Sequence, residues 1–274
     1  MNGTPNAGPL AGRTALVTGG SRGVGRAVAL RLARDGAAVA VNYRRDAAAA
    51  DEVVEQIVAA GGRAAAYCAS IDDEAAVADM VVAIRSDLGP VDLVVSNAGS
   101  ASRGQDVAST SYADYLQLMR VHAFGPIGLV QQVLPDMRKA ASGEVGRGDI
   151  VMISSNTTLS APPNSAPYTM AKAAMEMCVR TLAREERRHG IHANIVAPGL
   201  IATDMGKRLV SASRGTDIGD LDAAAPFGRV CRPEDVAGTV AFLVSPDSGY
   251  VTGQQLIVDG GGPNPTIFCR RTHE

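Results

Sequence analysis

The feature that most constrains the fold is a regular alternation of short apolar runs with longer helix-forming segments. The first apolar run, 14–17, ends at a glycine-rich turn, and a helix-forming segment follows it. Further apolar runs lie at 38–41, 64–68, 91–95, 150–153, 192–196 and 255–258. Continuous apolar runs are typical of strands buried on both faces, and helices between them favour parallel pairing with right-handed crossovers. The sequence therefore predicts an α/β fold, a doubly wound parallel sheet of seven strands with helices on both faces.

The chain has 274 residues and no linker or shift in composition that would mark a domain boundary. We expect one domain over 10–262, preceded by a disordered leader at 1–9 and followed by a tail at 263–274. The one long irregular piece, about 201–225, is rich in Gly, Ser and Asp. In a compact domain, a piece of this length is more often an active-site lid than an inert loop.

Charge and cysteine content exclude several classes of partner and site. With net charge −2 and a hydrophobic fraction of 46%, the chain offers no basic surface for nucleic acid or an anionic membrane. Its four cysteines form no Cys-x-x-Cys pair and have no histidine at ligand spacing, so we expect neither a disulfide framework nor a metal site. No apolar run has the length of a membrane span and no signal peptide is recognisable, so a cytoplasmic location is expected.

The glycines of the first turn, Gly19, Gly23 and Gly25, indicate a nucleotide site. They join the first strand to the first helix, where glycine lets the backbone approach a pyrophosphate at the helix N-terminus. A tight turn between packed elements is the alternative interpretation. The strand before the glycines and the helix after them favour a Rossmann-like dinucleotide site.

A second group of polar residues lies in the stretch 154–172, directly after the fifth apolar run. Tyr168 and Lys172 are one helical turn apart, so a phenol and an ammonium share a face. A nearby ammonium lowers the pKa of a tyrosine, which suits proton transfer near neutral pH. A Tyr and a Lys at this spacing are more often surface residues without a catalytic role. A catalytic role is therefore inferred only together with the nucleotide site that precedes them.

Together these motifs resemble the single-domain short-chain dehydrogenases/reductases. The resemblance covers about residues 10–262 and includes the segments Asn97-Ala98-Gly99, Tyr168-x-x-x-Lys172, Pro198-Gly199-Leu200-Ile201-Ala202-Thr203 and Val258-Asp259-Gly260-Gly261. Within the family, the chain is most similar to 3-oxoacyl-(acyl-carrier-protein) reductases and related ketoreductases. The resemblance implies an NAD(P)-dependent oxidoreductase acting on CH–OH and C=O groups.

The resemblance also assigns roles to single residues. Tyr168 would protonate the carbonyl oxygen as hydride arrives from C4 of the nicotinamide, and Lys172 would favour the phenolate and hold the nicotinamide ribose. Ser155, which lies 13 residues before Tyr168, would stabilise the charge that develops on oxygen. The cofactor-binding residues that the resemblance implies are Gly19, Ser21, Arg22, Gly23, Val24, Gly25, Tyr43, Arg44, Ser70, Ile71, Asn97, Ala98, Gly99, Tyr168, Lys172, Pro198, Gly199, Ile201 and Thr203.

The end of the second strand predicts which dinucleotide binds. Members of the family that prefer NAD carry an acidic residue there, whereas this chain has Tyr43 followed by Arg44 and Arg45. With Arg22 facing the same corner and no carboxylate expected there, up to three guanidinium groups are available for a 2′-phosphate. The sequence thus predicts NADP(H) as the cofactor. The alternative is that these arginines are solvated surface residues that contact no phosphate.

The chain departs from the family pattern at two places. Ser70 and Ile71 stand where the family usually has Asp-Val, so a hydroxyl replaces the carboxylate expected at the adenine amine. His122 replaces an asparagine whose backbone holds a water that connects the lysine to solvent. Three interpretations of His122 are open: a relay group that titrates near pH ~6.5, a packing histidine, or a damaged relay that leaves slow catalysis or nucleotide binding.

The leading hypothesis is an NADPH-dependent reductase of 3-oxoacyl or related ketones. The alternatives are an NAD(P)-dependent secondary-alcohol dehydrogenase of the hydroxysteroid or sugar type, and a weakly active nucleotide-sensing protein on the same scaffold. The substrate would be a small ketone or an acyl thioester, the latter on an acyl carrier protein. Five basic residues form either a docking patch for that carrier or ordinary solvated helix ends: Arg138, Lys139, Arg147, Arg187 and Arg188. Surplus apolar surface on the helices that begin near Tyr112 and Tyr168 favours a homotetramer.

Overall fold

The computed structural model describes residues 8–143 and 146–262, so residues 1–7 of the predicted leader and the whole predicted tail lie outside it. Its centre is a sheet of seven strands in the order β3-β2-β1-β4-β5-β6-β7, and all neighbouring strands are parallel. The strands are β1 (Thr14–Val17), β2 (Ala38–Tyr43), β3 (Arg63–Cys68), β4 (Leu93–Ser96), β5 (Gly148–Ile153), β6 (Ile191–Pro198) and β7 (Gln255–Val258). The sheet confirms the predicted seven-stranded, doubly wound α/β fold.

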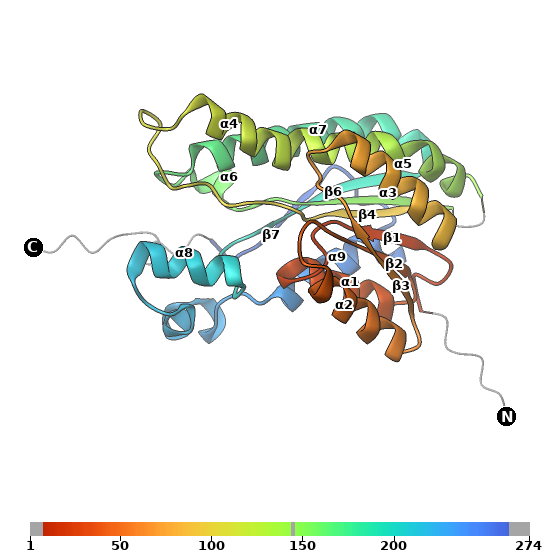
Figure 1. Cartoon of the computed structure of the whole chain (residues 1–274), viewed down its shortest axis with the longest axis horizontal. Coiled ribbons are helices and arrows are strands. Elements are labelled where there is room, and N and C mark those ends of the chain that lie inside the picture. Colours follow the sequence, from red (N-terminus) through yellow and green to blue (C-terminus); the bar gives the residue numbers. More distant parts are fainter. Residues whose placement is uncertain (1–7, 144–145, 263–274) are drawn as a thin grey trace, which may run out of the picture.

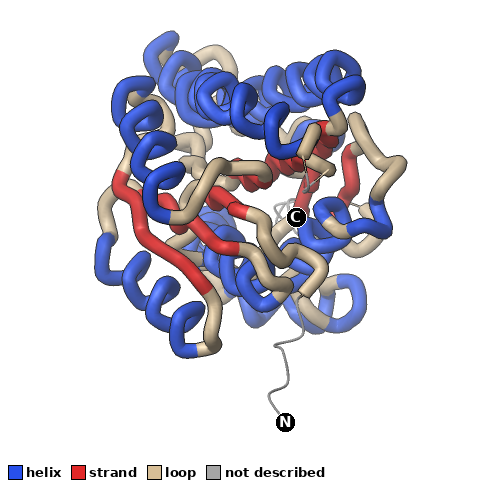
Figure 2. Tube along the Cα trace, turned by 90° about the vertical axis from the view of Figure 1, so that its right-hand side faces the viewer, coloured by secondary structure: helices blue, strands red, loops and turns tan. Residues whose placement is uncertain are grey.

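Helices cover both faces of the sheet, as Figures 1 and 2 show. One face carries α1 (Gly23–Arg34), α2 (Ala47–Ala59) and α9 (Pro233–Val244), and the other carries α3 (Glu74–Asp87), α4 (Tyr112–Met119), α5 (Gly125–Ala141) and α7 (Ala166–Glu186). Because successive side chains of a strand point to opposite faces, each buried strand contributes to two cores. Leu16 packs in the core with α3, α5 and α7, whereas the next residue, Val17, packs in the core with α1, α2 and α9.

A buried ion network joins the amino ends of three central strands. Arg13, directly before β1, is 6% exposed. Its Nε lies 2.6 Å from Oδ1 of Asp92, and its Nη1 lies 2.7 Å from Oδ2 of Asp149. Arg147 adds a second guanidinium against Asp149 at 2.8 Å. Buried charges are tolerated when they are paired and hydrogen-bonded, so these four residues serve the framework at the edge opposite to the predicted site.

The helical stretch that begins at Tyr112 contains a π-helical turn. This turn, η1 (Arg120–Phe124), joins α4 to α5 and carries His122. The helix passes so close to the end of β3 that a Cβ on Gly125 would lie 2.3 Å from the carbonyl oxygen of Ile71. Pro135 does not end α5, which continues to Ala141 because its buried face remains packed on both sides of the proline.

The piece 201–225, predicted to be irregular, is largely helical. It forms α8 (Asp204–Arg214) and the 3-10 helix η3 (Ile218–Ala224). Thr203 caps α8 by accepting a hydrogen bond from the backbone N–H of Gly206 at 3.1 Å, and Gly215 ends the helix with φ +68°. Two of the residues that suggested a loop, Gly215 and Asp217, are therefore helix caps. Four further short helices are α6 (Thr157–Ser160), η2 (Arg187–His189), η4 (Pro226–Gly228) and η5 (Pro246–Ser248).

The helices differ greatly in length. The longest, α7, has 21 residues, and within residues 8–143 and 146–262 no helix is both long enough and apolar enough to cross a membrane.

Candidate active site

The residues predicted to bind the cofactor and to catalyse all lie at or beside the carboxyl edge of the sheet. In a doubly wound sheet a ligand binds at this edge where the strand order reverses, which is between β1 and β4. The glycine turn follows β1, Tyr43 ends β2 and is followed by Arg44, and Ser70 and Ile71 follow β3. Residues 97–99 follow β4, Ser155 follows β5, and residues 198–203 end and follow β6. Tyr168 and Lys172 lie on α7.

The glycine turn has no room for side chains at its critical positions. Gly19 and Gly23 have φ of +61° and +52°, in the left-handed region that favours glycine. A Cβ on Gly25 would lie 2.2 Å from the carbonyl oxygen of Gly19 and 2.6 Å from Nδ2 of Asn97. The tight turn itself therefore requires these glycines.

Two asparagines fix the glycine turn from neighbouring strands. Asn97 donates to the carbonyl oxygens of Thr18 at 3.0 Å and Gly19 at 3.2 Å. Asn42, at the end of β2, accepts from the backbone N–H of Gly19 at 3.2 Å and donates to the carbonyl of Ala69 at 3.0 Å. Asn97 is among the residues predicted from the sequence, whereas Asn42 is not; its signal was a polar residue directly after an apolar run.

The amino end of α1 is suited to an anion. Its first turn has no acidic residue, and in the part of the chain that the structure describes no side chain caps it. The uncapped N–H groups and the helix dipole favour a phosphate at this position. Because the backbone also approaches closely at Gly25, the turn fits the pyrophosphate of a dinucleotide.

The corner beyond β2 carries a carboxylate that was not predicted from the sequence. Arg22 forms an ion pair with Asp46, and each side chain is about half exposed. Asp46 also caps α2 by accepting from the backbone N–H of Ala49 at 3.1 Å. The expectation of a corner without a carboxylate is therefore wrong, and an aspartate directly before a helix was the available signal. Arg44 is exposed beside the half-buried Tyr43.

A carboxylate also stands near the end of β3. The hydroxyl of Ser70 is hydrogen-bonded to Asp72. This bond holds the pKa of Asp72 below its ordinary value, with a smaller contribution from the charge of Arg44, while burial opposes the shift. A carboxylate two residues further along the chain therefore lies in contact with the hydroxyl of Ser70.

The hydroxyl of Ser155 lies close enough to the phenol of Tyr168 to lower its pKa. Burial has the larger effect and raises the pKa of Tyr168 to about 12. The expectation that Lys172 makes this tyrosine acidic is not met here, because burial of the phenol outweighs an ammonium 5.8 Å from the ring centroid. At neutral pH the phenol is protonated and is therefore a proton donor.

Lys172 connects α7 to the end of β5. Its side chain is buried, and Nζ donates to the carbonyl oxygen of Ile153 at 2.6 Å. Burial lowers the pKa of Lys172 to about 8, and the negative charge of Glu176 opposes that shift. The group is therefore an ammonium at neutral pH, but one that deprotonates well below the ordinary lysine range.

His122 is buried and neutral. Its Nε2 lies 2.8 Å from the carbonyl oxygen and 3.2 Å from the backbone nitrogen of Ser100. Burial and the charge of Lys172 lower the pKa of His122 to about 3, and the bond to Ser100 opposes the shift. The interpretation of a step that titrates near pH 6.5 is therefore wrong for the folded chain, whereas a packing role and a relay by a neutral ring both remain compatible with the geometry.

Two buried side-chain atoms among the described residues have no hydrogen-bond partner, and both belong to this region. They are Nδ1 of His122 and Oγ1 of Thr157, two residues after Ser155. Buried polar atoms are nearly always satisfied. These two are therefore available to a water molecule or to a polar group of a bound molecule.

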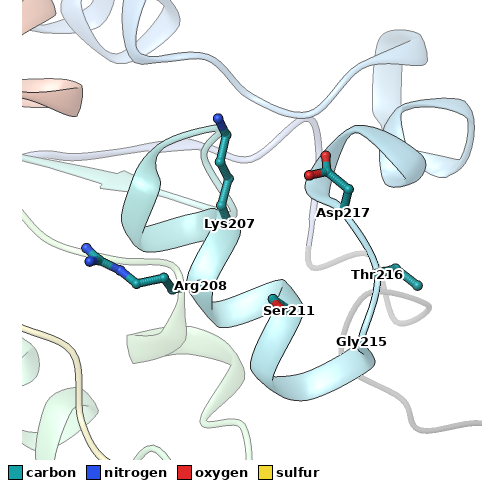
Figure 3. Close-up of a pocket in the computed structure, with 6 residues that line it drawn as sticks. All are labelled: Lys207, Arg208, Ser211, Gly215, Thr216 and Asp217. Carbon is teal, nitrogen blue, oxygen red and sulfur yellow. The ribbon is translucent and has the colours of Figure 1, made fainter.

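The lid begins against the glycine turn. A Cβ on Gly23 would lie 3.3 Å from Cγ2 of Thr203, and Ile201 forms a parallel bridge with Cys231. Further along the lid, a surface hollow of about 330 Å³ is lined by Lys207, Arg208, Ser211, Gly215, Thr216 and Asp217. Figure 3 shows Lys207 and Arg208 leaving α8 in different directions, so the two cations do not converge on one point.

The five basic residues proposed as a docking patch are largely engaged elsewhere. Arg138 is paired with Glu186 at 2.5 Å, and Arg147 is paired with Asp149 at 2.8 Å in the buried ion network. Lys139 lies 3.8 Å from Asp136. Three of the five residues are thus paired with carboxylates, whereas Arg187 and Arg188 are exposed.

The chain is an NAD(P)-dependent oxidoreductase that acts on CH–OH groups. Residues 19–262 match the family described as enoyl-(acyl carrier protein) reductase. The chain belongs to the short-chain dehydrogenase/reductase family, which confirms the resemblance seen in the sequence.

Relatives of this chain differ in what they act on. It is 38% identical over 252 residues to gluconate 5-dehydrogenase of Gluconobacter oxydans, covering 92% of this chain and 95% of that one. It is 35% identical over 253 residues to 3-oxoacyl-[acyl-carrier-protein] reductase of Synechocystis sp., covering 92% and 97%. Among solved structures, a short chain dehydrogenase from Burkholderia cenocepacia in complex with NADP matches with a TM-score of 0.81 and 34% identity, covering 92% and 98%.

Proposed function

We propose that this protein is an NADPH-dependent carbonyl reductase acting on 3-oxoacyl thioesters or related ketones. The observation that carries the proposal is the protonated phenol of Tyr168, which lies on α7 beside the hydroxyl of Ser155, just after β5. Carbonyl reduction needs a proton donor at the oxygen and a group that stabilises the negative charge developing there.

The proposed roles divide the work among three side chains. A bound nicotinamide would supply a hydride from its C4 atom. Tyr168 donates its phenolic proton to the carbonyl oxygen, and Ser155 donates a hydrogen bond to the same oxygen. Lys172 holds the nicotinamide ribose, and its positive charge favours the phenolate that remains after proton transfer.

NADP(H) is the proposed cofactor because Arg44 is exposed at the end of β2, where the 2′-phosphate of this dinucleotide would lie. The similarity to a structure solved with NADP supports the proposal. Arg22 contributes less than the sequence suggested, since Asp46 already neutralises it.

The test is the consumption of NADPH and NADH against a panel of acyl thioesters, simple ketones and diketones. We expect NADPH-dependent turnover of at least one 3-oxoacyl thioester or ketone, and equal turnover with NADH would contradict the cofactor assignment. The similarity to gluconate 5-dehydrogenase supports a second candidate, a dehydrogenase of sugar-type alcohols. Faster oxidation of such alcohols than reduction of any ketone would favour that candidate. Binding of NADPH without turnover of any member of the panel would favour a sensor.

A further inference from the structure

Glu176 is a buried carboxylate that the proposed reaction does not use. It lies on α7 one helical turn beyond Lys172 and is 7% exposed. Its Oε1 atom accepts hydrogen bonds from Oγ of Ser154 at 2.5 Å, Oγ1 of Thr158 at 2.9 Å and Nε2 of Gln255 at 3.0 Å. A buried carboxylate is stable only when it is held by donors in this way.

Two of these donors flank Ser155 in the sequence. Ser154 directly precedes it, and Thr158 follows three residues later on α6. The hydroxyl of Thr158 also lies 3.0 Å from the carbonyl oxygen of Ser155. Since a hydroxyl has one proton, Thr158 donates to one of these two acceptors at a time.

Helix α7 also holds the residue that precedes Ser154. Lys172 donates to the carbonyl of Ile153, so α7 contacts residues 153, 154 and 158 through two side chains one turn apart. Tyr168 lies on this helix as well. The relative position of Ser155 and Tyr168 therefore depends on the bonds that Lys172 and Glu176 make.

Glu176 also sets the charge around Lys172. Its carboxylate keeps the pKa of Lys172 from falling further under burial. The other titratable side chains that face Lys172 are Tyr168 and His122, and both are neutral at pH 7. Gln255, Ser154 and Thr158, which surround the carboxylate, carry no charge. In the described part of the chain, Glu176 is thus the negative group that offsets the buried ammonium.

We propose that Glu176 is a positioning residue. Its carboxylate fixes residues 154–158, the Ser155 segment, against the helix that carries Tyr168, and it supplies the counter-charge of Lys172. The inference rests on the proposed function, because it assumes that Ser155 and Tyr168 act on one carbonyl oxygen. An amide of the same shape cannot replace the carboxylate, since its neutral oxygen would face three donors or its NH₂ group would oppose them.

The kinetic test compares Glu176→Gln with Glu185→Gln, a control on an exposed position of the same helix. We expect kcat to fall about 10- to 100-fold in Glu176→Gln, the scale that small misplacements of reacting groups produce. The Kd for NADPH and the activity of the control should stay within about twofold of the parent. An unchanged kcat in Glu176→Gln overturns the proposal.

A second pair of variants decides the matter if Glu176→Gln does not fold. Thr158→Val removes one donor at nearly constant shape, and Thr158→Ser keeps the hydroxyl. We expect Thr158→Val to lose activity and Thr158→Ser to retain most of it. Equal activity of the two variants would show that the hydroxyl does not hold the Ser155 segment.

The counter-charge is measured directly by NMR, without reference to turnover. The chain has three lysines, Lys139, Lys172 and Lys207, so a ¹³C-lysine-labelled sample gives three resolvable titrations. Lys139 and Lys207 are exposed and serve as internal references. Lys172 should titrate near pH 8 in the parent and at lower pH in Glu176→Gln, because only the charge of Glu176 opposes burial. If Lys172 titrates at the same pH in both proteins, Glu176 is not its counter-charge.

The titration is independent of the proposed function. If the parent reduces no carbonyl, the proposed function fails, and the Lys172 titration still tests the role of Glu176.

Discussion

His122 and Tyr168 meet edge to face, with ring centroids 5.0 Å apart and ring planes at 80°. The imidazole reaches this position from the π-helical turn η1, and its Nε2 is fixed on Ser100. The histidine therefore packs against the proposed proton donor and at the same time anchors the segment that follows β4. Because the imidazole is neutral at pH 7, it forms an uncharged surface beside the phenol of Tyr168.

Replacement of His122 by asparagine should make the protein less sensitive to acid. The folded-state pKa of His122 is about 3, against about 6.5 for an unfolded histidine. Between these values only the unfolded chain binds this proton, so the free energy of unfolding falls as pH falls, by up to about 1.4 kcal/mol per pH unit. Urea unfolding of the parent and of His122→Asn between pH 4 and pH 7 should show the steeper loss in the parent.

The matched control is His189→Asn, which changes a half-exposed histidine in η2, the short helix that follows α7. It should follow the parent at each pH. The same three proteins also test the relay, because a pH–rate profile of His122→Asn that matches the parent from pH 5 to pH 8 is expected for a histidine that stays neutral. A limb near pH 6.5 in the parent alone would contradict the buried, neutral state of His122.

Tyr168→Phe should abolish carbonyl reduction while leaving NADPH binding intact. The variant removes the phenolic proton but keeps the ring that packs against His122. We expect a loss of about 10²- to 10⁴-fold in kcat, the usual contribution of a general acid. Activity is measured by NADPH consumption and binding by fluorescence titration. Turnover within tenfold of the parent would remove Tyr168 from the proton transfer.

The rate of reduction should fall above pH 8. Lys172 has a pKa of about 8 in the folded chain because its ammonium is buried. As pH rises through this value the group loses its proton, and the positive charge that favours the phenolate disappears. We therefore expect kcat/KM to be constant between pH 6.5 and 7.5 and to fall about tenfold per unit well above pH 8. A profile that stays flat to pH 9.5 would show that the charge of Lys172 is not required.

The sequence predicted the framework well because buried strands carry their own signal. The seven apolar runs, the glycine turn and the spacing from Ser155 to Lys172 are local patterns, and local patterns survive in the folded chain. Asp46, Asp72 and Glu176 were missed because their meaning depends on partners brought close only by the fold. The pKa of His122 was misjudged for the same reason, since burial in η1 cannot be read from residue spacing.

Preference for NADPH should depend on Arg44 more than on Arg22. Arg44→Ala should raise the Kd for NADPH about 10-fold or more, since a charged hydrogen bond to phosphate is worth roughly 1.5–3 kcal/mol, and should leave the Kd for NADH nearly unchanged. Arg22→Ala should have a smaller effect because Asp46 already pairs with Arg22. Isothermal titration of both cofactors checks these values, with Arg34→Ala at the far end of α1 as the control. Equal losses for NADPH and NADH would contradict a 2′-phosphate contact.

Asp46→Asn separates the two roles of Asp46. Asparagine keeps the hydrogen bond that caps α2, but it removes the charge that neutralises Arg22. The affinity for NADPH should therefore rise severalfold while the thermal stability changes little. An unchanged affinity for NADPH would show that Arg22 does not reach the phosphate even when it is released from the ion pair.

The exposed cations of the lid should matter for charged substrates only. Lys207 and Arg208 leave α8 in different directions, so each can meet a separate phosphate of a long acyl thioester. The double change Lys207→Ala with Arg208→Ala should raise KM for acetoacetyl-coenzyme A about 5- to 10-fold. It should leave KM for the acetoacetyl thioester of N-acetylcysteamine, which has the same reacting group and no phosphate, within twofold. Lys139→Ala, which removes an exposed lysine on α5, controls for the loss of positive charge as such. Equal rises in KM for both thioesters would mean that the lid contributes shape to the site and that its charges do not select the substrate.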